Sequence, residues 1–508
     1  MTRPPTAAER SLAAKVDGRA QRVAVARERL RVFVEALEPG LSRQRTTADL
    51  VAAAVDLLAQ PDRGHVWLAL AVLRAELPLD SDVLRVARAI ELEGSLPALR
   101  TALLPSRRLF ERGRELRTVE VVQDAVLVDM QHTSHTALAT GIQRVARQSA
   151  VRWANTHDVT FVGWAHDEKA LRRLTSAERK VALHGGAGAD QRAASGNHVV
   201  VPWQCTYVLP ELATEPRRTA RMLALASWSR SRTGVIGFDC VPLSSAETTA
   251  PGMAAAFANN LAAVRQMDRV AAISHAAAAE YEGWRRMLGA SGVPGPDVRP
   301  VMLPIEATVA GPEALAAARA ELVVDHLPLV LCVGSHEPRK NHLGVLQAAE
   351  IAWRAGSRFS LAFVGGNSWG GDEFGREVAR LQDAGRPVVT VSAISDDLLW
   401  GAYALARCVV FPSLNEGFGL PVAEAIATGT PVITSAFGSM SEIAAHGGAL
   451  LVDPRDDDAI AHALRCLVDD DEVHGRLAAQ AAAAPHTTWD DYADEVWKFL
   501  VAEPGSHD

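Results

Sequence analysis

The sequence predicts an α/β protein with two Rossmann-like, doubly wound parallel-sheet domains and an all-helical extension before them. Three observations support this prediction. The length of 508 residues exceeds what one hydrophobic core usually organises. Helical patterns without strands run to about residue 118. Short apolar runs then alternate with helical stretches, beginning near Val119 and restarting after Pro304.

Residues 1–118 are expected to form the helical extension. Apolar residues recur at helical spacing after Thr46 and Thr47, and again from Ser81 to a terminating Gly94. The segment contains no catalytic constellation. Extensions of this kind usually supply packing surface, so we expect a docking or homo-oligomerisation module.

Residues 119–304 are expected to form the first sheet domain. Apolar runs that read as buried strands alternate with helical stretches such as residues 142–153. Strand, helix, strand in this order implies a parallel sheet. The helical pattern gives way to strand-like apolar runs near Val119. The predicted strands are residues 125–129, 159–163, 198–202, 233–238 and 269–274.

Residues 305–480 are expected to form the second sheet domain, whose ligands should bind beyond the carboxyl ends of its strands. Residues 481–508 contain a last helix with an apolar face that includes Trp489 and Trp497. The six predicted strands are residues 329–333, 360–364, 388–391, 408–411, 432–434 and 450–452.

Charge and composition exclude several classes of function. The net charge of −8 provides no broad basic field for nucleic acid. No stretch resembles a signal peptide or reaches the 18 apolar residues of a membrane span, so membrane contact should be peripheral at most. The five cysteines are far apart and mostly lie in apolar runs, which is typical of a reduced chain. We therefore expect a cytoplasmic protein, with the inner membrane face as the alternative site.

Residues 411–424 join a buried strand to the start of a helix and hold two acids around a glycine-rich turn. Gly417 and Gly419 let the backbone approach a ligand closely, and the helix directs its positive end to the same place, which favours a diphosphate. The carboxylate of Glu424 is suited to a ribose diol. Glu416, at the turn itself, should face a sugar ring.

Residues 334–341 follow the first strand of the second sheet domain and supply cations at the same sheet edge. Arg339 offers a bidentate fork and Lys340 a point charge, so together they can neutralise a diphosphate leaving group. An adjacent Arg-Lys pair is usually solvated surface, but the downstream glycine turn favours a binding role.

Several other patterns are rejected. His336 and His342 are six residues apart, with Pro338 between them, which does not suit a zinc helix. Residues 365–371 lack the dinucleotide spacing of glycines, and no phosphate-binding P-loop occurs. Residues 456–458 are three aspartates that precede a helical run, where capping accounts for them. We therefore expect no metal site.

The stretch from Leu329 to Pro454 resembles the nucleotide-sugar-binding half of family 4 retaining glycosyltransferases, of the "glycosyl transferases group 1" type. Residues 334–341, 394–400, 415–421 and 438–442 carry the resemblance. It implies a GT-B fold, a nucleotide diphosphate sugar as co-substrate with no other cofactor, and retention at the anomeric carbon. By this resemblance the donor-binding residues are Gly141, Gly334, Arg339, Lys340, Ala393, Ile394, Gly417, Phe418, Gly419, Leu420 and Glu424, with Ala393 and Ile394 at the base and Glu416 at the donor sugar.

The first sheet domain resembles the family less. Residues 140–145, which include Gly141, resemble the glycine loop that approaches the donor phosphates, and residues 268–274 the strand before the interdomain linker. Many relatives have a His-Asp pair where this chain has Phe238 and Asp239. The candidates to replace the histidine are His132, His135 and Asp239. The resemblance also implies that the last helix packs back across the cleft.

These readings predict a hexosyl-type glycosyltransferase that acts on a glycan, lipid-linked or small-molecule hydroxyl acceptor, with retention and without metal. Glu416 and Asp239 are the candidate catalytic residues. Asp239 is flanked by apolar residues and is not a convincing nucleophile, so attack from the face that the leaving group vacates is preferred, with the leaving phosphate accepting the proton. The alternative is a catalytically idle GT-B-fold subunit for binding or assembly.

Overall fold

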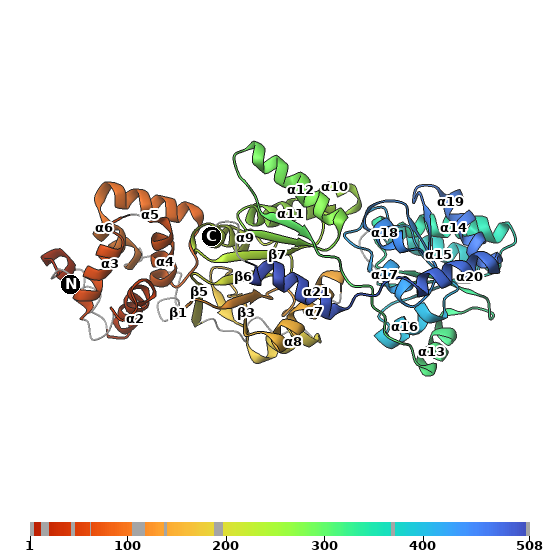
Figure 1. Cartoon of the computed structure of the whole chain (residues 1–508), viewed down its shortest axis with the longest axis horizontal. Helices are drawn as coiled ribbons and strands as arrows, with labels where there is room; N and C mark the ends of the chain where they lie inside the picture. The colour runs from red at the N-terminus through yellow and green to blue at the C-terminus, as the bar shows by residue number, and fades with distance from the viewer. Residues whose placement is uncertain are drawn as a thin grey trace.

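The computed structural model describes residues 5–11, 20–41, 46–60, 62–103, 117–136, 140–186, 197–366 and 371–503. Three parts follow one another along the long axis of the molecule (Figure 1). They are a helical extension, a first sheet domain in the middle and a second sheet domain at the other end.

The helical extension is held together by a largely apolar helix at its centre. This helix, α4, buries most of its residues, including Trp67. The side chain of Thr46 caps α3 in a capping box with Asp49, as expected for a helix that starts there. The described helices are α2 (Ala20–Leu37), α3 (Thr47–Leu57), α4 (Arg63–Arg74), α5 (Asp80–Glu93) and α6 (Ser95–Leu103).

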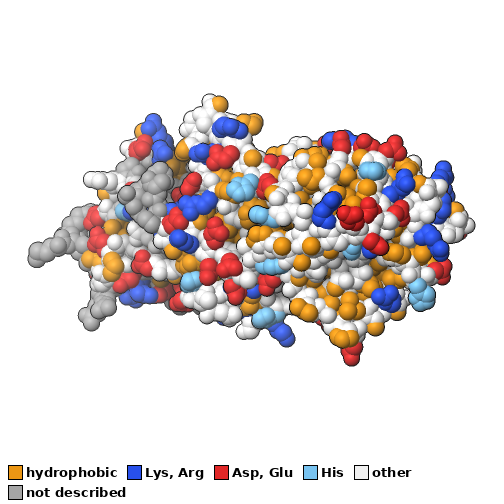
Figure 2. Space-filling view, turned by 45° about the vertical axis from the view of Figure 1, so that its right-hand side comes forward, with side chains coloured by type: hydrophobic (Ala, Val, Ile, Leu, Met, Phe, Trp, Pro, Cys, Tyr) orange, Lys and Arg blue, Asp and Glu red, His pale blue; other side chains and the backbone are white. Residues whose placement is uncertain are grey.

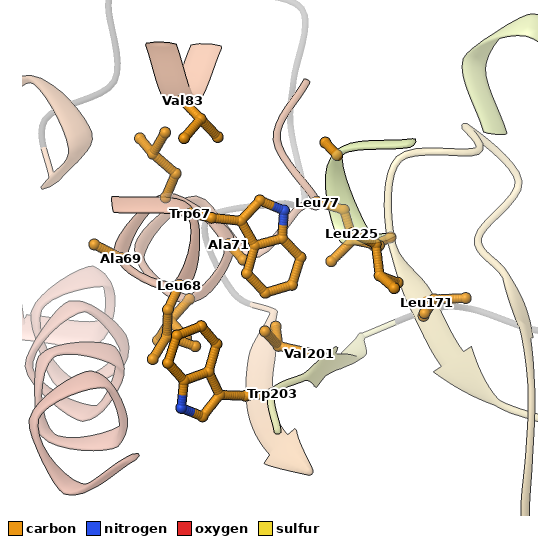
Figure 3. Close-up of a cluster of buried hydrophobic side chains, with 14 of the residues drawn as sticks. Trp67, Leu68, Ala69, Ala71, Leu77, Val83, Leu171, Val201, Trp203 and Leu225 are labelled. Atoms are coloured by element: carbon orange, nitrogen blue, oxygen red, sulfur yellow. The ribbon is translucent and has the colours of Figure 1, made fainter. Parts of the chain in front are cut away.

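The extension shares a hydrophobic core with the first sheet domain. Trp67 of α4 lies near Trp203 and Val201 from the sheet side (Figure 3). Polar contacts reinforce this packing, since the Leu77 amide donates to the Lys169 carbonyl at 2.7 Å. Burial of two tryptophans and their aliphatic neighbours stabilises the junction, because burying one large side chain contributes about 1.5–3 kcal/mol.

The first sheet has nine strands in the order β1-β5-β4-β3-β2-β6-β7-β8-β9. All its pairs are parallel except those of β4, which runs antiparallel to β3 and β5. The strands are β1 (Thr118–Val122), β2 (Val126–Asp129), β3 (Val159–Trp164), β4 (Leu171–Arg173), β5 (His198–Pro202), β6 (Thr206–Leu209), β7 (Arg232–Gly237), β8 (Arg269–Ala272) and β9 (Asp297–Pro300). The helices are α7 (Gly141–Thr156), α8 (Ser176–His184), α9 (Pro216–Trp228), α10 (Val241–Ser244), α11 (Met253–Val264) and α12 (His275–Ala290).

The second sheet has six strands, all parallel, in the order β12-β11-β10-β13-β14-β15. The order reverses between β10 and β13, which is where doubly wound sheets bind ligands. All six predicted strands are confirmed. The strands are β10 (Leu329–Val333), β11 (Ser360–Val364), β12 (Val388–Val391), β13 (Cys408–Phe411), β14 (Val432–Ser435) and β15 (Ala449–Val452). The helices are α13 (Pro312–Leu322), α14 (His342–Arg354), α15 (Asp372–Asp383), α16 (Asp396–Leu405), α17 (Leu420–Ala427), α18 (Gly438–Ile443), α19 (Asp457–Asp469) and α20 (Asp471–Ala482).

After α20 the chain returns to the first sheet domain. Helix α21 (Trp489–Trp497) lies against α7, and the indole Nε1 of Trp153 donates to the Ala493 carbonyl at 2.9 Å. A π-helical turn, Lys498–Ala502, then packs on β7 and β8. There Leu500 lies so close to β7 that a Cβ on Gly234 would be 3.0 Å from it. Figure 1 shows α21 beside α7 in the middle of the molecule.

Figure 2 shows basic and acidic side chains interspersed with apolar ones over this face. Within the described part of the chain, no helix combines the length and apolar character that a membrane span requires.

Candidate active site

The candidate site lies at the carboxyl ends of β10 and β13, facing the carboxyl ends of β7 and β8 in the first sheet domain. Two loops of the second sheet domain build it, residues 334–341 after β10 and residues 412–419 after β13. Both loops leave the sheet at the reversal of strand order, where the helices on either side diverge.

The loop after β10 is bent sharply at both ends. Gly334 has a φ of 147°, and Asn341 a φ of 58° just before α14. Gly365, at the end of β11, lies against this loop, because a Cβ there would be 1.9 Å from the Gly334 carbonyl oxygen. Gly365 is the first glycine of residues 365–371, which lack the dinucleotide spacing. Its role is to let β11 pack closely against this loop. The bend directs Arg339 and Lys340 towards the loop after β13.

Glu416 is held by both of these cations. Its Oε2 is 2.6 Å from Arg339 Nη1, and its Oε1 is 2.6 Å from Lys340 Nζ. The Ser413 hydroxyl donates to the same Oε1 at 2.7 Å. Burial acts to raise the pKa of Glu416, but Arg339 and Lys340 outweigh it and hold this pKa at about 2. The carboxylate is therefore ionised at any physiological pH.

Arg339 is also tied to the loop backbone. Its Nη1 donates to the Asn415 carbonyl at 2.8 Å, and its own carbonyl accepts from the Leu414 amide at 2.8 Å. Burial acts to lower the pKa of Arg339, but Glu416 and Glu337 raise it overall. The guanidinium thus carries a permanent charge in a position set by both loops.

Glu424 lies on α17, which is buried along most of its length. Only 5% of Glu424 is exposed, and the Tyr403 hydroxyl donates to its Oε2 at 2.6 Å. Its Oε1 forms an ion pair with Arg144, which belongs to α7 of the first sheet domain. Ala393 and Ile394, expected at the base, lie between β12 and α16, with Ala393 in the left-handed region at a φ of 56°.

Asp239 approaches the site from the first sheet domain, just after β7. A Cβ at Gly417 would lie 2.6 Å from Asp239 Oδ2 and 2.9 Å from the Phe238 carbonyl oxygen. Only glycine at position 417 allows this approach. Phe238 itself is 3% exposed and belongs to an apolar cluster that spans both sheet domains.

Further hydrogen bonds join the two sheet domains. The buried Ser274 hydroxyl donates to the Gly417 carbonyl at 2.6 Å and also caps α12. The Asn415 side chain donates to the Ser245 hydroxyl at 3.0 Å. Gly141 completes this contact, because a Cβ there would be 3.5 Å from Leu420. The loop of residues 412–419 therefore touches the opposite domain at several points.

The three candidates to replace the missing histidine have different surroundings. His135 pairs with the buried Glu178, with 2.8 Å between Nε2 and Oε1. The backbone amide of His132 donates to Glu211 at 2.6 Å, while its side chain is exposed. Of the three, Asp239 is the one that the structure brings against Gly417.

Sequence reasoning missed three residues of the site: Arg144, Ser274 and Tyr403. Ser274 had a visible signal, since a serine between a strand and an alanine-rich helix is typical of an N-cap. Arg144 lies within residues 140–145, which the resemblance places near the donor phosphates. Neither Arg144 nor Tyr403 had a local signal for its pairing with Glu424, because that partner is distant in the chain. Gly334, Arg339, Lys340, Glu416, Gly417, Gly419, Leu420 and Glu424 all lie along the two loops or on α17, and Phe418 is buried beside them.

Asp239 should make stability depend on pH. Burial raises its pKa to about 6, with Arg339 opposing and Glu280 and Glu416 adding to the shift. A carboxyl group whose pKa is higher in the folded state stabilises the fold when protonated, and this contribution is lost as the pH rises through about 6. We therefore expect Asp239→Asn to gain stability relative to the wild type between about pH 4 and pH 7, as measured by urea unfolding.

The control makes the same chemical change at an exposed position on α15, Asp383→Asn. A stability difference between wild type and Asp239→Asn that stays constant over this pH range would contradict the prediction.

Comparison with known proteins supports the fold. Residues 317–484 match the family model described as "Glycosyl transferases group 1". The chain is 37% identical over 163 residues to O-antigen chain mannosyltransferase B of Escherichia coli, covering 32% of this chain and 42% of that protein. It is 27% identical over 337 residues to the serotype-specific mannosyltransferase WbdA of Escherichia coli, covering 63% of this chain and 40% of that protein. The chain thus spans about two-fifths of the length of these curated relatives.

Among solved structures, that of Anabaena Alr3699/HepE in complex with UDP-glucose is similar, with a TM-score of 0.54 at 15% identity. The match covers 75% of this chain and 100% of that one. The structures that match in this way confirm the predicted GT-B fold. The part of the chain that carries both candidate loops, residues 317–484, is the part that matches the family model.

Proposed function

We propose that this chain transfers a hexosyl group from a nucleotide diphosphate sugar to a hydroxyl acceptor, with retention and without a metal ion. The acceptor is a glycan, a lipid-linked sugar or a small molecule. The observation that carries the proposal is the cluster of Arg339, Lys340 and Glu416 at the reversal of strand order, with Asp239 opposite. Two fixed cations, one ionised acid and a glycine turn suit a diphosphate and an adjoining sugar.

The donor's diphosphate binds Arg339 and Lys340 in this proposal. Each cation is now paired with Glu416 at 2.6 Å, and each has further N–H groups to offer a phosphate. The amides at the start of α17, which follows Gly419 at a φ of 102°, add partial positive charge. The ribose then lies at Glu424 and the base near Ala393 and Ile394.

The departing diphosphate is stabilised by charges that belong to the protein. Arg339 and Lys340 are preorganised by Glu416 and by the loop backbone, so little reorganisation is needed as charge develops on the leaving group. In this scheme the two cations neutralise the charge of the leaving diphosphate, as a divalent ion does in other glycosyltransferases.

Retention follows from attack on the face that the leaving group vacates, with the departing phosphate accepting the proton of the acceptor hydroxyl. Asp239 is a poor nucleophile for a double displacement, because its Oδ1 accepts from the Val241 amide at 3.1 Å and its Oδ2 lies against Gly417. A carboxylate there can instead hold a hydroxyl of the reacting sugar. Phe238 then serves as an apolar wall in place of the usual histidine.

The relatives support a sugar nucleotide as donor and a glycan as acceptor. Two are named mannosyltransferases, one of them for the O-antigen chain, and the Anabaena structure holds UDP-glucose. They leave the base and the sugar of the donor open here, because sugar selection depends on a few hydroxyl contacts that one loop can rearrange.

The test is a transfer assay with a panel of UDP-, GDP- and ADP-sugars in excess chelator, followed by NMR assignment of the product's anomeric configuration. We expect transfer with chelator present and a product with the anomeric configuration of its donor. An inverted product would refute retention, and activity regained only with magnesium or manganese would refute the metal-free site. Tight nucleotide binding without transfer to any acceptor would favour the idle binding subunit.

A further inference from the structure

Arg144 lies where three segments of the chain meet. It is in the first turn of α7, in the first sheet domain, just after Gly141. Its guanidinium pairs with Glu424 on α17 of the second sheet domain. The same guanidinium lies 5.8 Å from the ring centroid of Trp489, at the start of α21. One side chain thus contacts the second sheet domain from the first and also meets the segment that returns between them.

Both carboxylate oxygens of Glu424 are occupied in this arrangement. Tyr403, which is fully buried, donates to Oε2 at 2.6 Å, and Arg144 occupies Oε1. The Glu424 side chain is 6% exposed, whereas that of Arg144 is 32% exposed. The tyrosine is therefore a permanent partner within the second sheet domain, while the arginine reaches in from the opposite domain and has room to leave.

We infer that Arg144 is an internal competitor for the donor's ribose. The inference rests on the proposed function, in which Glu424 accepts hydrogen bonds from the ribose diol. A carboxylate can bind a diol in a planar fork only when an oxygen facing the cleft is free. The ribose must therefore displace the guanidinium from Oε1, and part of the donor's binding energy is used for this step.

The same geometry makes Arg144 a determinant of ligand choice. A ligand with a ribose gains Glu424 in exchange for the broken ion pair, whereas one that carries only phosphates meets Arg339 and Lys340 and leaves the pair intact. Only molecules in which the Arg144–Glu424 ion pair is open can bind the ribose. The apparent Kd for ribose-containing ligands is thus the intrinsic Kd divided by the fraction of molecules with the pair open.

The test uses Arg144→Met, which removes the charge and keeps the aliphatic stem. We expect the Kd for the tightest of UDP, GDP and ADP to fall about fivefold, as for an ion pair near the upper end of the range for partly exposed pairs. The Kd for inorganic pyrophosphate should stay unchanged. Isothermal titration calorimetry on the full chain measures both.

Arg152→Met is the matched control. Arg152 lies on the same helix α7 and pairs with Asp490 of α21, away from Glu424. Its removal takes away a comparable ion pair without touching the donor site, so the nucleotide Kd should not change. In a Glu424→Gln background, Arg144→Met should no longer tighten nucleotide binding, because there is no carboxylate left to release.

A nucleotide Kd that rises or stays the same in Arg144→Met would overturn the inference, since it would make Arg144 a ligand of the donor or a purely structural residue. So would an equal fall for pyrophosphate. Arg144→Gln repeats the test if the methionine variant does not fold. A wild-type chain that binds pyrophosphate but no nucleotide would remove the proposed function itself, which separates the two failures.

Discussion

Replacing Glu416 by glutamine should lower the turnover number by about 100-fold or more, the scale on which a charged group at a reacting centre contributes. Glutamine has the same shape but lacks the charge that holds Arg339 and Lys340, each now 2.6 Å from the carboxylate. The loss should appear mainly in kcat, because the groups that hold the ribose and the base are unchanged. Steady-state kinetics with the donor identified by the transfer assay measure it.

Glu350→Gln is the control, because Glu350 makes the same kind of double ion pair outside the site. Glu350 on α14 is also a carboxylate paired with two cations, Arg354 at 2.6 Å and Arg386 at 2.7 Å, but it lies outside both loops. Its loss should leave kcat within a factor of about two, since distant ion pairs contribute little to chemistry. Equal losses in kcat for the two variants, or a Glu416→Gln variant changed only in KM, would mean that Glu416 has another role.

Removing either cation should weaken nucleoside diphosphate binding strongly. The loss of a charge-assisted hydrogen bond costs about 1.5–3 kcal/mol, so we expect Arg339→Met and Lys340→Met each to raise this Kd by roughly 10- to 100-fold. Both variants also leave Glu416 with fewer partners in a buried place, so a lower melting temperature should accompany the weaker binding. Calorimetry and thermal unfolding on the same samples separate the two effects.

Comparing a nucleoside with its diphosphate shows whether the two cations bind the phosphates. Binding of the parent nucleoside, which lacks phosphate, should be unchanged in Arg339→Met and Lys340→Met, because neither cation is expected to touch it. Arg386→Met is the control for the loss of an arginine from a pair with a carboxylate outside the site. Unchanged nucleoside diphosphate affinity in both cation variants would return these residues to a structural role, namely holding Glu416.

The second sheet domain could be read almost completely from local sequence. Its four inner strands, β10, β11, β13 and β14, are buried almost throughout, so each reads as a short apolar run between turn residues, such as Leu329–Val333. The edge strands β12 and β15 are partly exposed but are still short, mostly apolar runs. The two loops with the glycines, cations and acids follow directly from strands β10 and β13. Because parallel strands end at one sheet edge, the sequence also predicted that the loops would lie together.

Several strands of the first sheet domain could not be predicted from the sequence, for physical reasons. β4 has three residues, and β6 starts just after β5 along the chain although the two strands are not neighbours in the sheet. β9 lies at the edge with a half-exposed face. β4 and β9 lack the long buried run from which a strand is recognised. β6 is buried along its whole length, but it follows β5 so closely in the chain that the two runs are not easily separated in the sequence.

The sequence by itself therefore determined the fold class, the six strands of the second sheet and the two loops that carry Arg339, Lys340 and Glu416. Only the tertiary structure decided which groups meet them across the cleft: Asp239 at Gly417, Ser274 at the same residue and Arg144 at Glu424. The reason is that periodicity and turn chemistry act over a few neighbouring residues. The partners of an ion pair such as Arg144 and Glu424 lie 280 positions apart and are brought together by the packing of two domains.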